Sequence, residues 1–414
     1  MRTVHAAGLP IGDDYPPRIM GVLNVSDESP YDPSVHDDPG EAAAYVDEEL
    51  VDEGADIVDV GLESANKRFE ALSPAEELER LDTAVETIES VSGDPVFSIE
   101  TRYAEVAEAA LNRGFDMVND VCGFADPEMP AVCREYDVAV SKMASPPDLA
   151  RPGAVCDVDW ATARSPSWAR QADYVDRVYE ALKGNGFTEK TIVDPAFGGW
   201  SEAKTIEDDR ETFRRLREFR GFGRPILVSI NRKNFLRHIA GRSTEEALPV
   251  SLAATSMAVE RGAHVVRTHD VAETRDAALV GDAFTERDRV VGDGVSVARL
   301  EVRRAGELRR HLERIGAEAP AAEELVGQVF EVSGIGPDAA GTLLATAKRE
   351  GVTVRRGDGA LLLGGSEAAL ASLATELPAT SALEPVIEAL GAGGGSADGS
   401  TAGGATGGRS PGGR

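Results

Sequence analysis

The amino-acid sequence predicts a (β/α)8 barrel, the TIM-barrel fold, followed by a small α/β domain and a disordered Gly-rich tail. Short apolar runs alternate with amphipathic stretches from Arg18 to about Phe284, which indicates parallel strands joined by right-handed helical crossovers. The pattern changes after that region, and from Gly391 onward the chain has no large apolar side chain to bury. The predicted parts are a barrel over residues 1–286, a small α/β domain over 287–390 and a tail over 391–414.

Eight short apolar runs are the predicted barrel strands, and apolar residues at helical spacing lie between them. Eight such units over roughly 270 residues match a (β/α)8 barrel. An open doubly wound sheet is the alternative, although no Gly-x-Gly-x-x-Gly motif follows the first run. The predicted strands are Ile19–Val25, Ile57–Gly61, Val96–Ile99, Met117–Val121, Val138–Ser141, Thr191–Val193, Ile226–Ile230 and Val265–Arg267. The predicted helices lie within Gly40–Glu53, Pro74–Ser90, Ala104–Arg113, Tyr174–Gly184, Arg210–Phe219 and Val250–Arg261.

The region after the barrel contains a second set of strands and helices. It carries no recognisable catalytic constellation, so the sequence assigns it no role. The predicted strands are Val295–Val302, Gln328–Val332, Val352–Arg356 and Ala360–Leu363, and the predicted helices are Ala305–Ile315, Asp338–Arg349 and Glu367–Leu377.

The chain is strongly acidic, with a formal net charge of −29 and 72 acidic residues against only seven lysines. Binding to nucleic acid is not expected, because phosphate recognition needs clustered cations. Acidic residues occur along the whole chain, as in proteins that work at high salt, where carboxylates stay hydrated and their mutual repulsion is screened. We therefore expect a halophilic, archaeal source.

No apolar stretch approaches the roughly 20 residues needed to cross a bilayer, so no membrane association is expected. The segment Met1–Pro17 lacks the apolar core of a signal peptide. The three cysteines, Cys122, Cys133 and Cys156, have neither the number nor the spacing of a disulfide framework or a zinc site. These features predict a cytoplasmic protein in which Cys122 and Cys133 are buried structural thiols.

Polar residues stand at the carboxyl ends of most predicted strands, which is where barrel enzymes carry their active sites. Placing polar groups there without a role would carry a desolvation cost. The residues are Asn24, Glu63, Ser64, Glu100, Asn119, Asp120, Asp194, Arg232, Lys233, Arg267 and His269.

These residues suit two kinds of ligand. Glu100, Asn119 and Asp194 can pair with the amine and ring N–H of an aminopyrimidinone, and Lys233 can donate to its carbonyl. Asn24, Arg267 and His269 suit an anion, because arginine offers a fork of donors to phosphate oxygens. The sequence thus predicts a pocket for a flat heterocycle at one end and a diphosphate at the other.

The same residues lie in stretches that resemble dihydropteroate synthase. Each stretch is a weak signal alone, but they occur in the family's order over about 250 residues. The matching stretches are Ile19–Ser26, Gly54–Gly61 with Glu63–Ser64, Glu100–Thr101, Asn119–Val121, Ile192–Pro195 with Gly198, Arg232–Lys233 with Phe235, and Arg267–Val271.

The resemblance implies that p-aminobenzoate displaces diphosphate from hydroxymethyl-dihydropterin diphosphate to form dihydropteroate. It implies a homodimer formed through the last barrel helices and a Mg2+ ion held by Asn24. The implied catalytic residues are Lys233, Arg267 and His269. The implied pterin ligands are Glu100, Asn119, Asp194 and Lys233, the diphosphate ligands are Asn24, Arg267 and His269, and weaker candidates for the second substrate are Ser64, Trp200 and Arg232.

The departures from the family pattern cluster in the loops that meet the second substrate. Three alternatives follow: a dihydropteroate synthase with divergent loops, a pterin enzyme that uses another nucleophile, or a non-catalytic pterin-binding paralogue. The main departures are Asp27–Asp32 in the first loop, Ala65–Lys67 where the family has Thr-Arg-Pro, Glu100 for Asp, Ala144 for His, Gly198–Ser201 for Gly-Phe-Gly-Lys, and Asn231 for Ser.

Three further residues have a structural and a functional interpretation. Asp59 lies within the second predicted strand and is expected to be a buried structural acid, with a functional role as the alternative. Arg232 either contacts the second substrate or positions the loop of Lys233. Lys204 is expected to be solvated, although it could replace the missing loop lysine.

Overall fold

The computed structural model describes residues 1–25, 34–36, 38–63, 71–149, 151–285, 289–292, 295–298, 300, 302–316, 322–356 and 360–391. The chain divides into two compact units, Met1–Arg299 and Leu300–Arg414. This division lies later than residue 286, so the predicted domain boundary there stays a prediction. The predicted tail lies almost wholly outside the described residues. None of the helices in the described ranges is long and apolar enough to cross a membrane.

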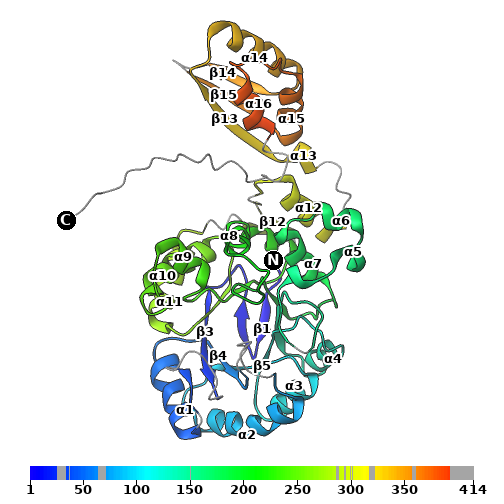
Figure 1. Cartoon of the computed structure of the whole chain (residues 1–414). Coiled ribbons are helices and arrows are strands. Elements are labelled where there is room, and N and C mark those ends of the chain that lie inside the picture. Colours follow the sequence, from blue (N-terminus) through cyan, green and yellow to red (C-terminus); the bar gives the residue numbers. More distant parts are fainter. Residues whose placement is uncertain are drawn as a thin grey trace, which may run out of the picture. The chain divides into compact units, whose positions relative to one another are not determined.

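The first unit is a barrel of eight parallel strands, which confirms the predicted fold class (Figure 1). The strand order is β8-β7-β6-β5-β4-β3-β10-β9, and a parallel bridge between Val193 and Ile226 joins the two ends. This closure excludes the open doubly wound sheet. The strands are β3 (Arg18–Asn24), β4 (Ile57–Gly61), β5 (Val96–Thr101), β6 (Met117–Asp120), β7 (Ala139–Met143), β8 (Thr191–Asp194), β9 (Leu227–Val228) and β10 (Val265–Thr268).

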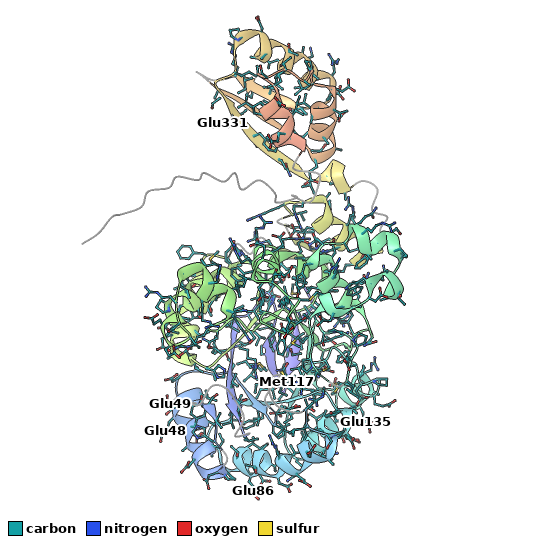
Figure 2. All side chains as sticks on the ribbon, in the orientation of Figure 1. Glu48, Glu49, Glu86, Met117, Glu135 and Glu331 are labelled. Carbon is teal, nitrogen blue, oxygen red and sulfur yellow. The ribbon has the colours of Figure 1, made fainter. Side chains whose placement is uncertain are left out.

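Helices surround the strands and present acidic side chains outward (Figure 2). The labelled Glu48, Glu49, Glu86 and Glu135 are exposed on this outer layer, whereas Met117 is buried among the strands. The helices are α1 (Pro39–Tyr45), α2 (Pro74–Ser90), α3 (Ala104–Leu111), α4 (Met129–Glu135), α7 (Tyr174–Lys183), α8 (Ile206–Arg214), α9 (Asn234–Ala240), α10 (Leu248–Glu260) and α11 (Val271–Ala283). A π-helical turn over Val46–Val51 continues α1, and a 3-10 segment over Leu216–Phe222 follows α8.

An N-terminal hairpin closes one end of the barrel. Its strands β1 (Val4–Ala6) and β2 (Leu9–Ile11) were not predicted, because three residues are too few for a periodic signal. The hairpin packs against one apolar residue from each strand. These residues are Met20, Ile57, Val96, Met117, Ala139, Ile192, Leu227 and Val265. Since they lie near the amino ends of the strands, the carboxyl ends are left for the functional site.

Two short helices, α5 (Trp160–Ala163) and α6 (Pro166–Gln171), lie in the long connection between β7 and α7. They were not predicted, since each is shorter than two turns. The rings of Trp160 and Trp168 lie 5.2 Å apart and pack the two helices together. This segment follows the carboxyl end of β7, on the side of the barrel that carries the polar residues.

The second unit contains a three-stranded antiparallel sheet in the order β13-β15-β14. Its core includes Leu343, Leu363, Leu370 and Leu373. The elements are α12 (Ala305–Arg314), α13 (Ala322–Leu325), β13 (Gly327–Ser333), α14 (Pro337–Arg349), β14 (Thr353–Arg356), β15 (Ala360–Ser366), α15 (Glu367–Glu376) and α16 (Glu384–Gly391). The predicted strand Val295–Val302 is instead β12 (Val295–Ala298), which pairs with β11 (Arg289–Gly292) and belongs to the first unit.

Close packing of α10 against α11 requires a glycine. A Cβ atom at Gly281 would lie 2.4 Å from the carbonyl oxygen of Ser256. We expect Gly281→Ala to lower the free energy of unfolding by about 2–3 kcal/mol, because the two helices must move apart to make room for the methyl group. Urea titration measures this change. Gly341→Ala on α14 is the control: nothing lies within 4 Å of its Cβ position. It should stabilise its unit by ~0.5–1 kcal/mol, and a neutral Gly281→Ala would contradict the packing argument.

Candidate active site

A polar layer lies directly above the apolar layer that the hairpin closes. Successive side chains of a strand point to opposite faces, so residues two positions beyond the apolar ring also point into the barrel. The polar residues at these positions are Asp59, Ser98, Asn119, Ser141, Asp194, Ser229 and Arg267, and the eighth position is Val22. Two further positions along, the polar inward residues are Asn24 on β3 and Glu100 on β5, while β4 and β7 have Gly61 and Met143 there. The carboxyl end of the barrel is therefore filled with polar groups.

Arg267 is the centre of this layer. Its Nε donates to Asp59 Oδ2 at 2.7 Å and its Nη2 donates to Glu100 Oε2 at 2.8 Å. Asn119 Nδ2 donates to the same Asp59 oxygen at 2.9 Å. The structure thus brings together Glu100, Asn119 and Arg267, which were predicted on three different strands.

Asp59 is the buried acid that the sequence predicted, and it lies among the candidate site residues. Its side chain is fully buried, and its other oxygen, Oδ1, has no hydrogen-bond partner within the described residues. The same is true of the buried hydroxyls of Ser98 and Ser141. The alternation Ile57, Asp59, Gly61 along β4 was the signal that could have placed Asp59 inside the barrel. These three polar atoms in one layer are available to hydrogen-bond a polar ligand.

Burial changes the titration of the carboxylates. It raises the pKa of Glu100 to about 7, against the opposing effect of Arg267. Burial likewise raises the pKa of Asp194 to about 6, opposed by the backbone N–H of Ala196 and by Lys233. Although burial alone would lower it, the pKa of Arg267 rises because Glu100 and Asp59 stabilise its charge. Arg267 therefore stays charged, while the two acids titrate near neutral pH.

Lys233 follows β9 and stands at the N-cap of α9. Burial lowers its pKa, and the charge of Arg267 acts in the same direction. The backbone of Gly198 passes beside it, so that a Cβ atom at Gly198 would lie 3.4 Å from Lys233 Nζ. Lys233 Nζ also lies 6.0 Å from the centre of the Trp200 ring, and the indole Nε1 donates to Phe197 O at 3.1 Å. Trp200 is thus beside Lys233, where a second ring could stack.

The guanidinium of Arg232 is held by hydrogen bonds to other groups of the protein. Its guanidinium donates to both oxygens of Asp270, each at 2.8 Å, and to the carbonyl oxygens of Thr244 and Glu245. These contacts link the loop that carries Lys233 to the loop that carries His269. They favour the positioning role over direct contact with the second substrate, which stays a prediction.

His269 directly follows β10, beside Arg267. Burial lowers the pKa of His269 to about 3, and the charges of Arg267 and Lys233 act in the same direction. The imidazole is therefore neutral at pH 7, and it can serve as a hydrogen-bond donor or acceptor but not as a cation.

Asn24 ends β3 at the mouth of the barrel. Its Nδ2 donates to Ser34 Oγ at 3.1 Å. A Cβ atom at Gly61 would lie 2.9 Å from Asn24 Oδ1, so only glycine leaves room for this amide. Ser64, predicted for the second substrate, lies outside the described residues.

The connection after β7 is fastened to the loop after β8. Ser201 Oγ donates to Asp157 Oδ1 at 2.6 Å, and Asp157 lies just before α5. Ser201 immediately follows Trp200. The connection after β7 is therefore joined to the loop that carries Trp200.

Comparison with known proteins identifies the family. The model of the pterin binding enzyme family matches residues 20–269, more than half of the chain. The chain belongs to the pterin-binding enzyme family. The matched range begins in β3 and ends at His269, so it includes every residue predicted for the site.

Individual relatives and solved structures support the same family assignment. A probable bifunctional folylpolyglutamate synthase/dihydropteroate synthase of Halobacterium salinarum is 35% identical over 266 residues, which is 64% of this chain but only 31% of that protein. The dihydropteroate synthase of Bacillus subtilis is 29% identical over 66% of this chain and 90% of its own. Among solved structures, Xanthomonas albilineans dihydropteroate synthase with 4-aminobenzoic acid has a TM-score of 0.53 at 28% identity, covering 68% of this chain and 98% of its own. The Coxiella burnetii enzyme in complex with pteroic acid has a TM-score of 0.54 at 27% identity, with the same two coverages.

Proposed function

We propose that the chain is a dihydropteroate synthase, which joins hydroxymethyl-dihydropterin diphosphate to p-aminobenzoate and releases diphosphate. The observation that carries this proposal is the network of Arg267 with Asp59, Asn119 and Glu100 inside the barrel, beside Asp194 and Lys233. The names of the relatives, and the pteroic and 4-aminobenzoic acids in two similar structures, support the same reaction.

The pterin is assigned to the buried polar layer. Asp194 and Glu100 would accept hydrogen bonds from the amine and ring N–H groups, and Lys233 would donate to the ring carbonyl. The unsatisfied Asp59 Oδ1 supports this assignment, because a buried acceptor without a donor carries a free-energy cost of about 1–3 kcal/mol that a ligand N–H can offset.

In the reaction, the aromatic amine forms a bond to the pterin methylene carbon while the bond from that carbon to diphosphate oxygen breaks. The amine proton is then lost to solvent. Negative charge grows on the departing oxygen, where Arg267 and the neutral His269 would donate hydrogen bonds. Positive charge grows on the methylene and the attached ring, close to the carboxylates of Glu100 and Asp194. Because an aromatic amine is neutral at pH 7, no strong general base is required.

We propose Mg2+ as the partner of the diphosphate, with the amide oxygen of Asn24 as its protein ligand. Donation from Asn24 Nδ2 to Ser34 orients that amide. Mg2+ is commonly held by one or two protein oxygens together with substrate phosphates, and this donor set fits that pattern. No group of three His, Cys, Asp or Glu residues suited to a metal occurs within the described ranges. When bound, Mg2+ would neutralise charge on the leaving group.

A second candidate is a pterin transferase that uses a different nucleophile. The loop after β8 departs from the family pattern at Gly198–Ser201, and its Ser201 Oγ donates to Asp157 Oδ1, so the groups near Trp200 differ from those expected around p-aminobenzoate. The pterin ligands would keep their roles, and only the acceptor amine would differ.

We propose a homodimer formed through the last barrel helices. Met257 on α10 and Leu279 and Val280 on α11 are large apolar side chains that remain substantially exposed, and Phe284 follows α11 with 78% of its surface exposed. Neighbouring exposed apolar groups are typical of a protein interface.

We propose that the enzyme works in a cytoplasm of high salt. All three cysteines are free, as expected in a reducing compartment, and Cys122 and Cys133 are buried. The net charge of −29 and the similarity to a Halobacterium salinarum protein support a halophilic origin.

The test is diphosphate release in molar salt with Mg2+, the pterin diphosphate and p-aminobenzoate, with Lys233→Ala in parallel. Release should require both substrates, fall when Mg2+ is chelated and be lost in the variant. Turnover of the pterin diphosphate without any preference for p-aminobenzoate would favour the second candidate. Tight pterin binding without release would indicate a non-catalytic paralogue.

A further inference from the structure

Lys204 and Asp209 form a buried ion pair next to the site. Lys204 was expected to be solvated, but its side chain is 1% exposed and that of Asp209 is 2% exposed, with Nζ 2.6 Å from Oδ1. Removing two charges from water carries a large desolvation cost, which the contacts of the pair must offset. Such a pair is a poor way to gain stability alone.

Both members of the pair also bind the backbone of the loop after β8. Lys204 Nζ donates to Ala196 O at 2.7 Å. The carboxylate of Asp209 accepts from Gly198 N at 3.2 and 3.3 Å. The ion pair therefore holds both ends of the three-residue segment Ala196–Gly198, which we name the β8 tripeptide.

The β8 tripeptide has an unusual backbone. Ala196 has φ 63°, in the left-handed region that non-glycine residues rarely adopt, and Gly198 has φ 117°. Such a conformation is strained for a non-glycine residue and persists only where the surroundings impose it. The contacts of Lys204 with Ala196 O and of Asp209 with Gly198 N are the surroundings that do so.

Each residue of the β8 tripeptide touches a different part of the site. Ala196 N donates to Asp194 Oδ1 at 2.7 Å, and Phe197 O accepts from the Trp200 indole. Gly198 lies against the Lys233 side chain, where no Cβ is present to displace it. A shift of this segment would move a pterin ligand, a ring-stacking residue and the site lysine together.

We propose that Lys204 and Asp209 are positioning residues, which hold the β8 tripeptide so that Asp194 and Lys233 stand at the separation that the pterin ring requires. This rests on the proposed function only in its assignment of the pterin to Asp194 and Lys233. Neither Lys204 nor Asp209 needs to contact substrate, since both act through the backbone of Ala196 and Gly198.

The experiment measures the affinity of the purified full-length chain for 6-hydroxymethylpterin in molar salt, together with the melting temperature. The variants are Lys204→Met, Asp209→Asn and the double variant. Arg215→Met is the matched control, because it breaks another buried ion network, with Asp173 and Glu218, whose members lie outside the β8 tripeptide.

Each single variant should weaken pterin binding on the order of 10- to 100-fold, as expected for a displacement of the ligating groups. The double variant should recover melting temperature, since no unpaired charge is left buried, but should not recover binding, since the hold on the β8 tripeptide is still lost. Arg215→Met should lower the melting temperature and leave binding unchanged.

Recovery of binding in the double variant would overturn the inference, because stability alone would then explain the effect. Unchanged binding in Lys204→Met, or equal weakening in Arg215→Met, would overturn it too. If Lys204→Met does not fold, Asp209→Asn and the double variant decide by the same criteria. A wild-type chain that binds the pterin but has no turnover would defeat the proposed synthase function and leave this inference standing, whereas one that binds no pterin would defeat both.

Discussion

Replacing Arg267 by Met should reduce the rate of diphosphate release on the order of 10³-fold, the loss typical of removing a donor that stabilises developing charge. Arg267 is the residue that joins the two halves of the site, since its guanidinium binds Asp59 and Glu100 and stands beside His269. Its removal would leave two buried carboxylates without their cation. The measurement is kcat at saturating concentrations of both substrates.

Arg267→Lys is the matched control, because it keeps the positive charge but loses the fork that reaches Asp59 and Glu100 together. Its rate should lie between those of wild type and Arg267→Met. Circular dichroism should establish that both variants remain folded. A kcat within tenfold of wild type in folded Arg267→Met would show that diphosphate leaves elsewhere.

Pterin binding should weaken as the pH falls through about 6. Burial raises the pKa of Asp194 to about 6, so its carboxylate is available as an acceptor above that pH and is progressively protonated below it. The value of kcat/KM for the pterin substrate should therefore fall about tenfold per pH unit below 6 through Asp194 alone. Glu100, whose pKa burial raises to about 7, contributes a separate step at higher pH.

Asp194→Asn separates the two steps. It should lose roughly 10²- to 10³-fold in pterin affinity, because two charge-assisted hydrogen bonds of about 1.5–3 kcal/mol each are weakened. The step near pH 6 should vanish from its pH profile, while the step near pH 7 remains. Persistence of the step near pH 6 in Asp194→Asn would assign it to another group.

The barrel was predictable because its strands and helices have strong local signals. The strand Ile57–Gly61 and the helix Pro74–Ser90 were predicted with the bounds that the structure has. The location of the candidate site residues was predictable too, because the carboxyl ends of parallel strands meet at one end of a barrel, whereas their roles stay a prediction. Asn24, Glu100, Asn119, Asp194, Lys233, Arg267 and His269 all lie there.

What the sequence did not reveal depends on contacts between distant segments. Lys204 precedes α8 within the polar run Ser201–Thr205, so no local pattern indicates that it is buried; its partner Asp209 is on the helix itself. The role of Asp59 depends on Arg267, 208 residues away. The N-terminal hairpin also depends on distant contacts, because it packs against one residue from each of the eight barrel strands. Its own short sequence does not predict these contacts.

The most direct test of the synthase proposal is the identity of the product. Mass spectrometry of a reaction containing the pterin diphosphate and p-aminobenzoate, in molar salt with Mg2+, should detect dihydropteroate formed in equal amount to the diphosphate released, and neither product with Lys233→Ala. Diphosphate release accompanied by hydroxymethyl-dihydropterin, or by a pterin joined to some other amine, would contradict the assignment of p-aminobenzoate as the second substrate.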